Sequence, residues 1–189
     1  MLFLFLEHLL SKQLFYNLLE LCPPGKVAVN IPAFTAVFVR AVLEYVEYSN
    51  DWSLAEEIFP VLKKIIEGFV DRMAENHLIP LYCGQEYWNF YEWTEGMVGR
   101  ERHEKEVFES PLNAFVSDAF RCFAKICEKC SPNLAEVYLS LHQSMNQAIH
   151  ELFFDKQTKA YFTNLKDKKP LHVLTQGLLL YINAVLKEY

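Results

Sequence analysis

Residues 31–51 read IPAFTAVFVRAVLEYVEYSND and contain a helix with almost no polar face. Pro32 suits the first helical turn, where its missing N–H is no loss, and the polar cluster at 49–51 ends the helix. We therefore predict a helix over about 32–48. Because its apolar residues lie all round the axis, this helix must be covered by neighbours on all sides. The stretch predicts an inner helix of a layered helical protein.

The next helix, predicted over about 53–76, has a different pattern. Ser53 and Glu56 have the spacing of a capping box at its start. Its apolar residues form one stripe, and the rest of its surface is charged. The members of the stripe are Ile58, Leu62, Ile65, Ile66 and Phe69. We expect this helix to lie in an outer layer.

Four further helices follow from the same periodicity. They are predicted over about 2–21, 111–130, 132–154 and 171–187, with an irregular stretch over 77–107 and a short turn or hairpin at 160–163. Inner and outer types tend to alternate, the helix over 132–154 being an outer one with His142 facing solvent. We therefore predict one all-α domain over 1–189, an α/α toroid with about three helical hairpins of a six-hairpin (α/α)6 barrel.

Composition excludes several classes of protein. The 189 residues are 52% hydrophobic and 22% charged, so the chain can bury enough apolar surface to fold. A formal net charge of -6 and the lack of a basic stripe argue against a nucleic-acid partner. No run of uncharged apolar residues is long enough to cross a membrane. The opening apolar run lacks a cationic region and is interrupted by Glu7 and His8, so we expect no signal peptide.

The cysteines and histidines show no metal or redox pattern. Five cysteines without a regular framework favour a reducing compartment, and we expect a cytoplasmic protein. Cys127 and Cys130 form a CxxC, but neither a second CxxC nor a pair of histidines accompanies it. We therefore interpret the CxxC as part of a helix end rather than as a zinc site. We expect no metal and no cofactor.

The segment most informative about function is YCGQEYWNFYEWTEG at residues 82–96. It combines two Trp with four other aromatic residues and three carboxylates. Aromatic planes beside carboxylates suit sugar rings, whose C–H faces pack on indole and whose hydroxyls bind to carboxylate oxygens. A loop that packs its aromatic residues over the core would have the same composition. Composition alone leaves both interpretations open.

Several short motifs occur in an order and spacing that resemble a known family. They are Ile31–Phe34, Tyr48–Asp51, Phe59–Lys63, Trp88–Trp93, Ser110–Ala114, Phe153–Asp155 with Tyr161, and His172 with Gln176 and Gly177. From about residue 25 onward the chain resembles the catalytic domain of the α-L-rhamnosidases, glycoside hydrolase family 78. The resemblance implies an (α/α)6 barrel and an inverting glycosidase that acts on terminal rhamnosides.

The resemblance also implies which residues face the sugar and which catalytic carboxyls of the family have no match in this chain. It places Trp88, Glu92 and Trp93 on a sugar-facing rim, with His172 as a further candidate, and Glu92 stands where the family usually has Asp. Inverting hydrolysis needs two carboxyls roughly 6.5–9.5 Å apart. The family's general-acid motif, which precedes the Ile-Pro helix, has no match here, and its general base lies downstream of the last helix seen here. Catalytic residues are therefore left unassigned, and we expect this chain alone to be inactive.

Two functions remain open on this basis. The chain is a part or relative of a rhamnosidase that binds a rhamnose-containing glycoside, or it is a non-catalytic sugar-binding or helical interaction module. Half a barrel would leave apolar faces of the inner helices uncovered, and such patches on a protein surface imply partners. We therefore expect self-association through the inner helices, or cover supplied by residues 2–21.

Overall fold

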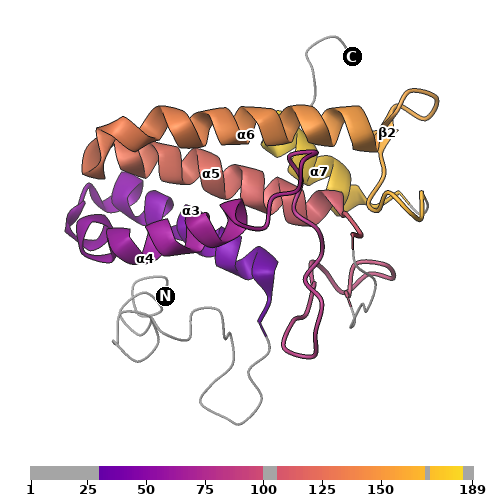
Figure 1. The fold of residues 1–189 in the computed structure, drawn as a ribbon, viewed down its shortest axis with the longest axis horizontal. Helices are drawn as coiled ribbons and strands as arrows, with labels where there is room; N and C mark the ends of the chain where they lie inside the picture. Colours follow the sequence, from indigo (N-terminus) through magenta and orange to yellow (C-terminus); the bar gives the residue numbers. More distant parts are fainter. Residues whose placement is uncertain (1–29, 100–105, 169–170, 185–189) are drawn as a thin grey trace.

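The computed structural model describes residues 30–99, 106–168 and 171–184, and this part is almost entirely helical (Figure 1). Its elements are α3 (Pro32–Ser49), α4 (Ser53–Val70), α5 (Ser110–Cys130), α6 (Pro132–Phe153), β1 (Phe154–Asp155), β2 (Ala160–Tyr161) and α7 (Val173–Tyr181). The strands form an antiparallel hairpin in which Phe154 pairs with Tyr161. The all-α prediction is confirmed. The helix predicted over 2–21 lies outside the described residues.

Helix α5 is the centre of the structure. It packs against α3, α4, α6 and α7, and Figure 1 shows it between α6 on one side and α3 and α4 on the other. Fifteen of its 21 residues are buried, among them Phe120 and Phe123 with no exposed surface. Burying each such ring contributes about 1.5–3 kcal/mol. By contrast, α4 and α6 each bury one stripe, so the predicted alternation of inner and outer helices is confirmed for these elements.

The two inner helices beside α5 are covered on one side only. On α3, Phe34 and Val37 expose 39% and 38% of their surface, and on α7 Leu180 and Tyr181 expose 62% and 55%. Helix α3 is therefore not covered on all sides, and its exposed apolar residues agree with the uncovered inner-helix faces that were expected of half a barrel. The described part is a toroid-like arrangement of two hairpins, α3–α4 and α5–α6, with α7 packed against α5 and its Tyr181 beside Arg40 of α3.

Helix α4 is shorter than predicted because the chain that follows it pairs with a distant helix, α5. It ends at Val70 rather than near residue 76. The backbone of His77 has a left-handed conformation, which turns the chain inward. Leu78 and Ile79 are then fully buried. The Asn113 side chain on α5 accepts from Ile79 N at 2.7 Å and donates to Ile79 O at 3.1 Å. This pairing decides where α4 stops.

Three other details differ from the sequence predictions. The start of α4 is not a capping box, because Asp51 Oδ1 accepts hydrogen bonds from the backbone N and hydroxyl of Ser53 at 3.0 and 2.6 Å. Helix α7 ends at Tyr181, since Asn183 adopts a left-handed conformation. His142 is buried against α5 rather than exposed on α6, because a hydroxyl on α5 supplies a polar partner for it.

We expect Asn113→Ala to destabilise the protein by about 2–3 kcal/mol, because both backbone groups of buried Ile79 would lose their partner. Urea unfolding followed by circular dichroism measures the change. The matched control is Asn133→Ala on the exposed start of α6, where we expect a change of about 0.5 kcal/mol or less. Equal effects of the two substitutions would contradict the role given to Asn113.

Candidate functional site

The aromatic loop over residues 82–99 lies beside the first turn of α3 and is fixed by hydrogen bonds to its own backbone. Asn89, which exposes 2% of its surface, donates from Nδ2 to Tyr82 O at 2.8 Å and accepts from Tyr82 N at 3.2 Å. An amide that pairs with both backbone groups of another residue closes a loop as a strand partner would. Asn89 thereby sets the width of the loop.

A second anchor joins the loop to the chain entering α3. Asn30 N donates to Glu86 O at 2.7 Å, and Trp88 N donates to Asn30 O at 2.8 Å. These two bonds form a short parallel bridge between Asn30 and Tyr87. Because Pro32 starts α3 two residues after Asn30, the bridge fixes Trp88 relative to that helix.

Glycine is required where the loop folds back on itself. Gly99 has φ +55°, and a Cβ atom there would lie 1.6 Å from the backbone oxygen of Asn89. No other residue could bring the two chain segments so close. This approach lets the Trp88 indole N–H donate to the carbonyl of Val98, so the indole is held at its polar end.

Four aromatic rings form a cluster at the loop surface. Phe90 lies 4.8 Å from Trp88, 4.9 Å from Trp93 and 6.2 Å from Phe34 of α3 between ring centroids. The two indoles meet edge to face at 5.9 Å. Phe90 is buried and Trp88 is half-buried, whereas Trp93 remains 77% exposed. The cluster therefore holds one large aromatic face in water on an ordered loop.

An exposed carboxylate lies next to this indole in the chain. Glu92 precedes Trp93 in the chain, is exposed, and accepts a hydrogen bond on Oε2 from the Thr94 hydroxyl. The turn that carries them is closed by Met97, whose N donates to Thr94 O at 2.9 Å and whose O accepts from Tyr91 N at 3.0 Å. Glu92 and Trp93 thus place an exposed acceptor and an exposed aromatic ring at consecutive positions of the loop.

The structure brings His172 to the same loop from a distant part of the sequence. His172 precedes α7 and exposes only 8% of its surface. A Cβ atom on Gly96, which has φ +84°, would lie 3.0 Å from His172 Nε2. The imidazole therefore packs on the loop backbone at Gly96. Of the four predicted site residues, Trp93 and Glu92 are exposed, Trp88 is half-buried and His172 is buried.

The cysteine pair lies in the last turn of α5, as predicted. Burial raises the pKa of the Cys127 thiol to about 12, so it is protonated at neutral pH. Within residues 30–99, 106–168 and 171–184, no three His, Cys, Asp or Glu side chains are grouped to hold a metal ion. Among the helices of these ranges, none combines the length and apolar character needed to cross a bilayer.

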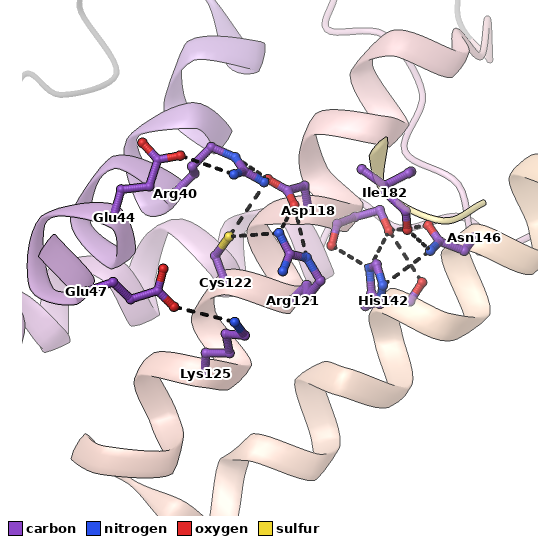
Figure 2. Close-up of polar contacts among 11 residues, drawn as sticks. Arg40, Glu44, Glu47, Asp118, Arg121, Cys122, Lys125, His142, Asn146 and Ile182 are labelled. Carbon is purple, nitrogen blue, oxygen red and sulfur yellow. Dashed lines mark hydrogen bonds and ion pairs between the residues drawn. The ribbon is translucent and has the colours of Figure 1, made fainter. Parts of the chain in front are cut away.

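The sequence did not predict two polar clusters on α5 (Figure 2). In the first, Asp118 binds both Arg40 of α3 and Arg121, and the Arg40 guanidinium lies 4.5 Å from the ring centroid of Tyr181. In the second, His142 of α6 meets a serine of α5. Only the spacing of Asp118 and Arg121 was visible in the sequence, because the other contacts join helices far apart in the chain.

Comparisons with known proteins show a likeness of fold. No protein-family model and no curated protein matches the chain. Among solved structures, a GH78 family rhamnosidase of Bacillus sp. GL1 matches 85% of this chain and 16% of its own, with 17% identity and a TM-score of 0.73. A rhamnosidase from Klebsiella oxytoca with rhamnose bound matches 88% of this chain and 30% of its own, with 15% identity and a TM-score of 0.70. The chain spans less than a third of either enzyme and shares with that part an all-α, toroid-like fold.

Proposed function

We propose that the chain is a single-domain part or relative of a rhamnosidase-type glycoside hydrolase, and that its aromatic loop binds a terminal rhamnose or related deoxyhexose. The observation that carries the proposal is Trp93, an indole that an ordered loop leaves 77% exposed. The cluster with Trp88 and Phe90 fixes the ring in advance, so little conformational entropy is lost when a ligand packs on it. The shared fold with two rhamnosidases supports the choice of sugar.

The chemistry of a 6-deoxyhexose fits this surface. Its methyl group and ring C–H bonds give it an apolar face that can pack on the Trp93 indole. Its hydroxyls can donate to the Glu92 carboxylate, which has about four acceptor sites and uses one for Thr94. His172 would contribute by fixing the loop at Gly96. We assign no catalytic acid or base, and we propose binding without turnover for this chain alone.

We further propose a reducing, cytoplasmic setting. Cys122, Cys127 and Cys130 are free thiols in the structure. Burial raises the pKa of Cys122 to about 12, which keeps that thiol protonated and unreactive.

Saturation-transfer NMR with L-rhamnose tests the proposed site. We expect transfer from the wild type to L-rhamnose and, for Trp93→Ala, binding weaker by roughly tenfold, the factor that loss of an aromatic contact worth about 1.4 kcal/mol gives. Tyr48→Ala is the matched control, because Tyr48 is 90% exposed at the other end of α3. D-glucose and L-fucose serve as comparison sugars.

Absence of transfer from the folded wild type to any sugar would contradict the proposed site, as would equal losses in Trp93→Ala and Tyr48→Ala. Incubation with an aryl α-L-rhamnoside separates the two functions. Release of the aryl alcohol by the wild type would show an enzyme, whereas rhamnose binding without release supports a non-catalytic module.

Gly96→Ala tests the contact between the loop and His172. The added methyl would meet Nε2 and would sit at a positive φ, so we expect weaker rhamnose binding and a loss of about 1–3 kcal/mol in stability. Gly177→Ala is the control in α7, where no atom lies within 4 Å of the added Cβ and where alanine favours the helix by about 1 kcal/mol. Equal rhamnose affinity in both variants would remove His172 from the site.

The second candidate, an interaction module, is favoured by the exposed apolar side chains of α3 and α7. We propose that two copies associate through this face, which includes Phe34, Val37, Leu180 and Tyr181. Light scattering should show a concentration-dependent dimer for the wild type and a monomer for Leu180→Lys. Val137→Lys, at a 52% exposed position on the outer helix α6, should leave the dimer intact. A wild-type monomer that binds no hydrophobic dye would contradict this proposal.

A further inference from the structure

Three helices meet at one polar network, formed by the buried Ser117 of α5, the buried His142 and the half-buried Asn146 of α6, and the backbone carbonyl of Ile182 just after α7. His142 Nδ1 lies 2.9 Å from both the hydroxyl and the carbonyl oxygen of Ser117. Asn146 Nδ2 lies 3.2 Å from His142 Nε2 and 2.9 Å from Ile182 O. Figure 2 shows His142, Asn146 and Ile182 converging from α6 and the chain that follows α7.

The contacts fix which atom carries each hydrogen. A carbonyl oxygen only accepts, so the contact with Ser117 O places a hydrogen on His142 Nδ1. Ile182 O likewise accepts from the amide nitrogen of Asn146, and the Ser117 hydroxyl donates to Asn146 Oδ1 at 2.6 Å. The second hydrogen of Asn146 Nδ2 then points to His142 Nε2, which accepts it. The network is complete only with a neutral imidazole.

A proton on Nε2 would place two donors opposite each other. The Asn146 amide could relieve the conflict by turning over, which would bring its oxygen to Nε2 and take its nitrogen away from Ile182 O. Alternatively, the imidazole could leave its position between Ser117 and Asn146. The first response removes the donor to Ile182 directly, and the second removes the neighbour that orients Asn146.

The Ile182 carbonyl belongs to the turn that packs the end of α7 against the rest of the structure. Ile182 exposes 1% of its surface and Ala184 2%, with the left-handed Asn183 between them. Helix α7 has only nine residues, and just Thr175 and Leu179 within it are fully buried. Losing the bond to Ile182 O would leave a buried carbonyl unpaired at the end of a helix with only these two buried residues.

We propose that Ser117, His142 and Asn146 form an acid-sensitive latch, in which protonation of His142 breaks the hydrogen bond to Ile182 O and releases the C-terminal turn of α7 from α5 and α6.

The surroundings of His142 agree with a proton-resistant folded state. Burial lowers the pKa of His142, Arg121 of α5 also lowers it, and Asp118 of α5 raises it. Helix α7 carries no acidic or basic side chain, and Tyr181, its titratable residue, faces Arg40. The unfolded chain takes up this proton near pH ~6.5, so the stabilisation is complete above that pH and is lost as the pH falls below it.

A second histidine of α6 provides an internal control. His150 Nδ1 lies 2.7 Å from the Tyr161 hydroxyl, and that hydroxyl donates to Ala184 O at 3.3 Å. A protonated His150 can still donate from Nδ1 to the hydroxyl oxygen, so the bond to Ala184 survives. Burial lowers the pKa of His150 as well. In this arrangement, however, a proton on His142 opposes the bond to Ile182 O, whereas a proton on His150 leaves the Tyr161 hydroxyl free to donate to Ala184 O.

Hydrogen exchange over residues 178–184 tests the latch, since the amides of Ile182, Asn183 and Ala184 bond to carbonyls of α7. After correction for intrinsic rates, we expect wild-type protection to be lower at about pH 5 than at about pH 7.5, by up to about tenfold for each pH unit below ~6.5, where an exposed imidazole takes up a proton. His142→Gln, whose neutral amide can accept from Asn146, should show equal protection at both values. His150→Gln should behave as the wild type does.

Wild-type protection that does not change with pH would overturn the latch, and so would an equal fall in His142→Gln. A second measurement needs no variant. In the folded wild type at neutral pH, nitrogen-15 chemical shifts of His142 should show hydrogen on Nδ1 and none on Nε2. Hydrogen on Nε2 at neutral pH would overturn the proposal by itself.

Discussion

The structure depends on how the polar side chains within the most buried helix find partners. Helix α5 carries Ser110, Asn113, Ser117 and Asp118 on surfaces that exclude water, and an unpaired polar group there would cost about 1–3 kcal/mol. Each of the four pairs with a different segment. Ser110 bonds to Phe162 O, Asn113 to the backbone of Ile79, Ser117 to α6, and Asp118 to Arg40 of α3. Apolar burial brings the helices together, but these pairings decide which segment lies at which turn of α5.

The same rule fixes the aromatic loop. Asn89 pairs with Tyr82, Asn30 with Glu86 and Trp88, and Asn113 with the segment that leads into the loop. A loop whose backbone groups are paired in this way has few conformations. Its Trp93 is therefore held in place with its apolar ring in water, and this exposure costs free energy. Packing over the core accounts for Phe90 and Tyr91, which are buried. It does not account for Trp93, and this difference within one segment favours binding over simple cover.

Periodicity predicted the helices because each has a local cause. The starts at Pro32 and Pro132 and the single stripe of α4 are properties of neighbouring residues, and they agree with the structure. The errors share a distant cause. Helix α4 stops early because Asn113 captures Ile79, and His142 turns inward because Ser117 offers it a partner. Trp93 was predicted as a site residue from the family resemblance, and no local pattern could place His172 against Gly96.

Helix α7 links the site to the latch, and its two halves are held by different contacts. The first half is fixed by Thr175, whose hydroxyl lies 2.8 Å from that of Thr163, and by Gln176, which pairs with both backbone groups of Tyr161. None of these groups titrates near neutral pH, so His172, which precedes them, should stay against the loop when the second half loosens. Leu180 and Tyr181 lie in that second half, on the face proposed for association. Acidification should therefore alter association through α7 while sugar binding at the loop is retained. A change of pH alone thus distinguishes the proposed association from the proposed sugar binding.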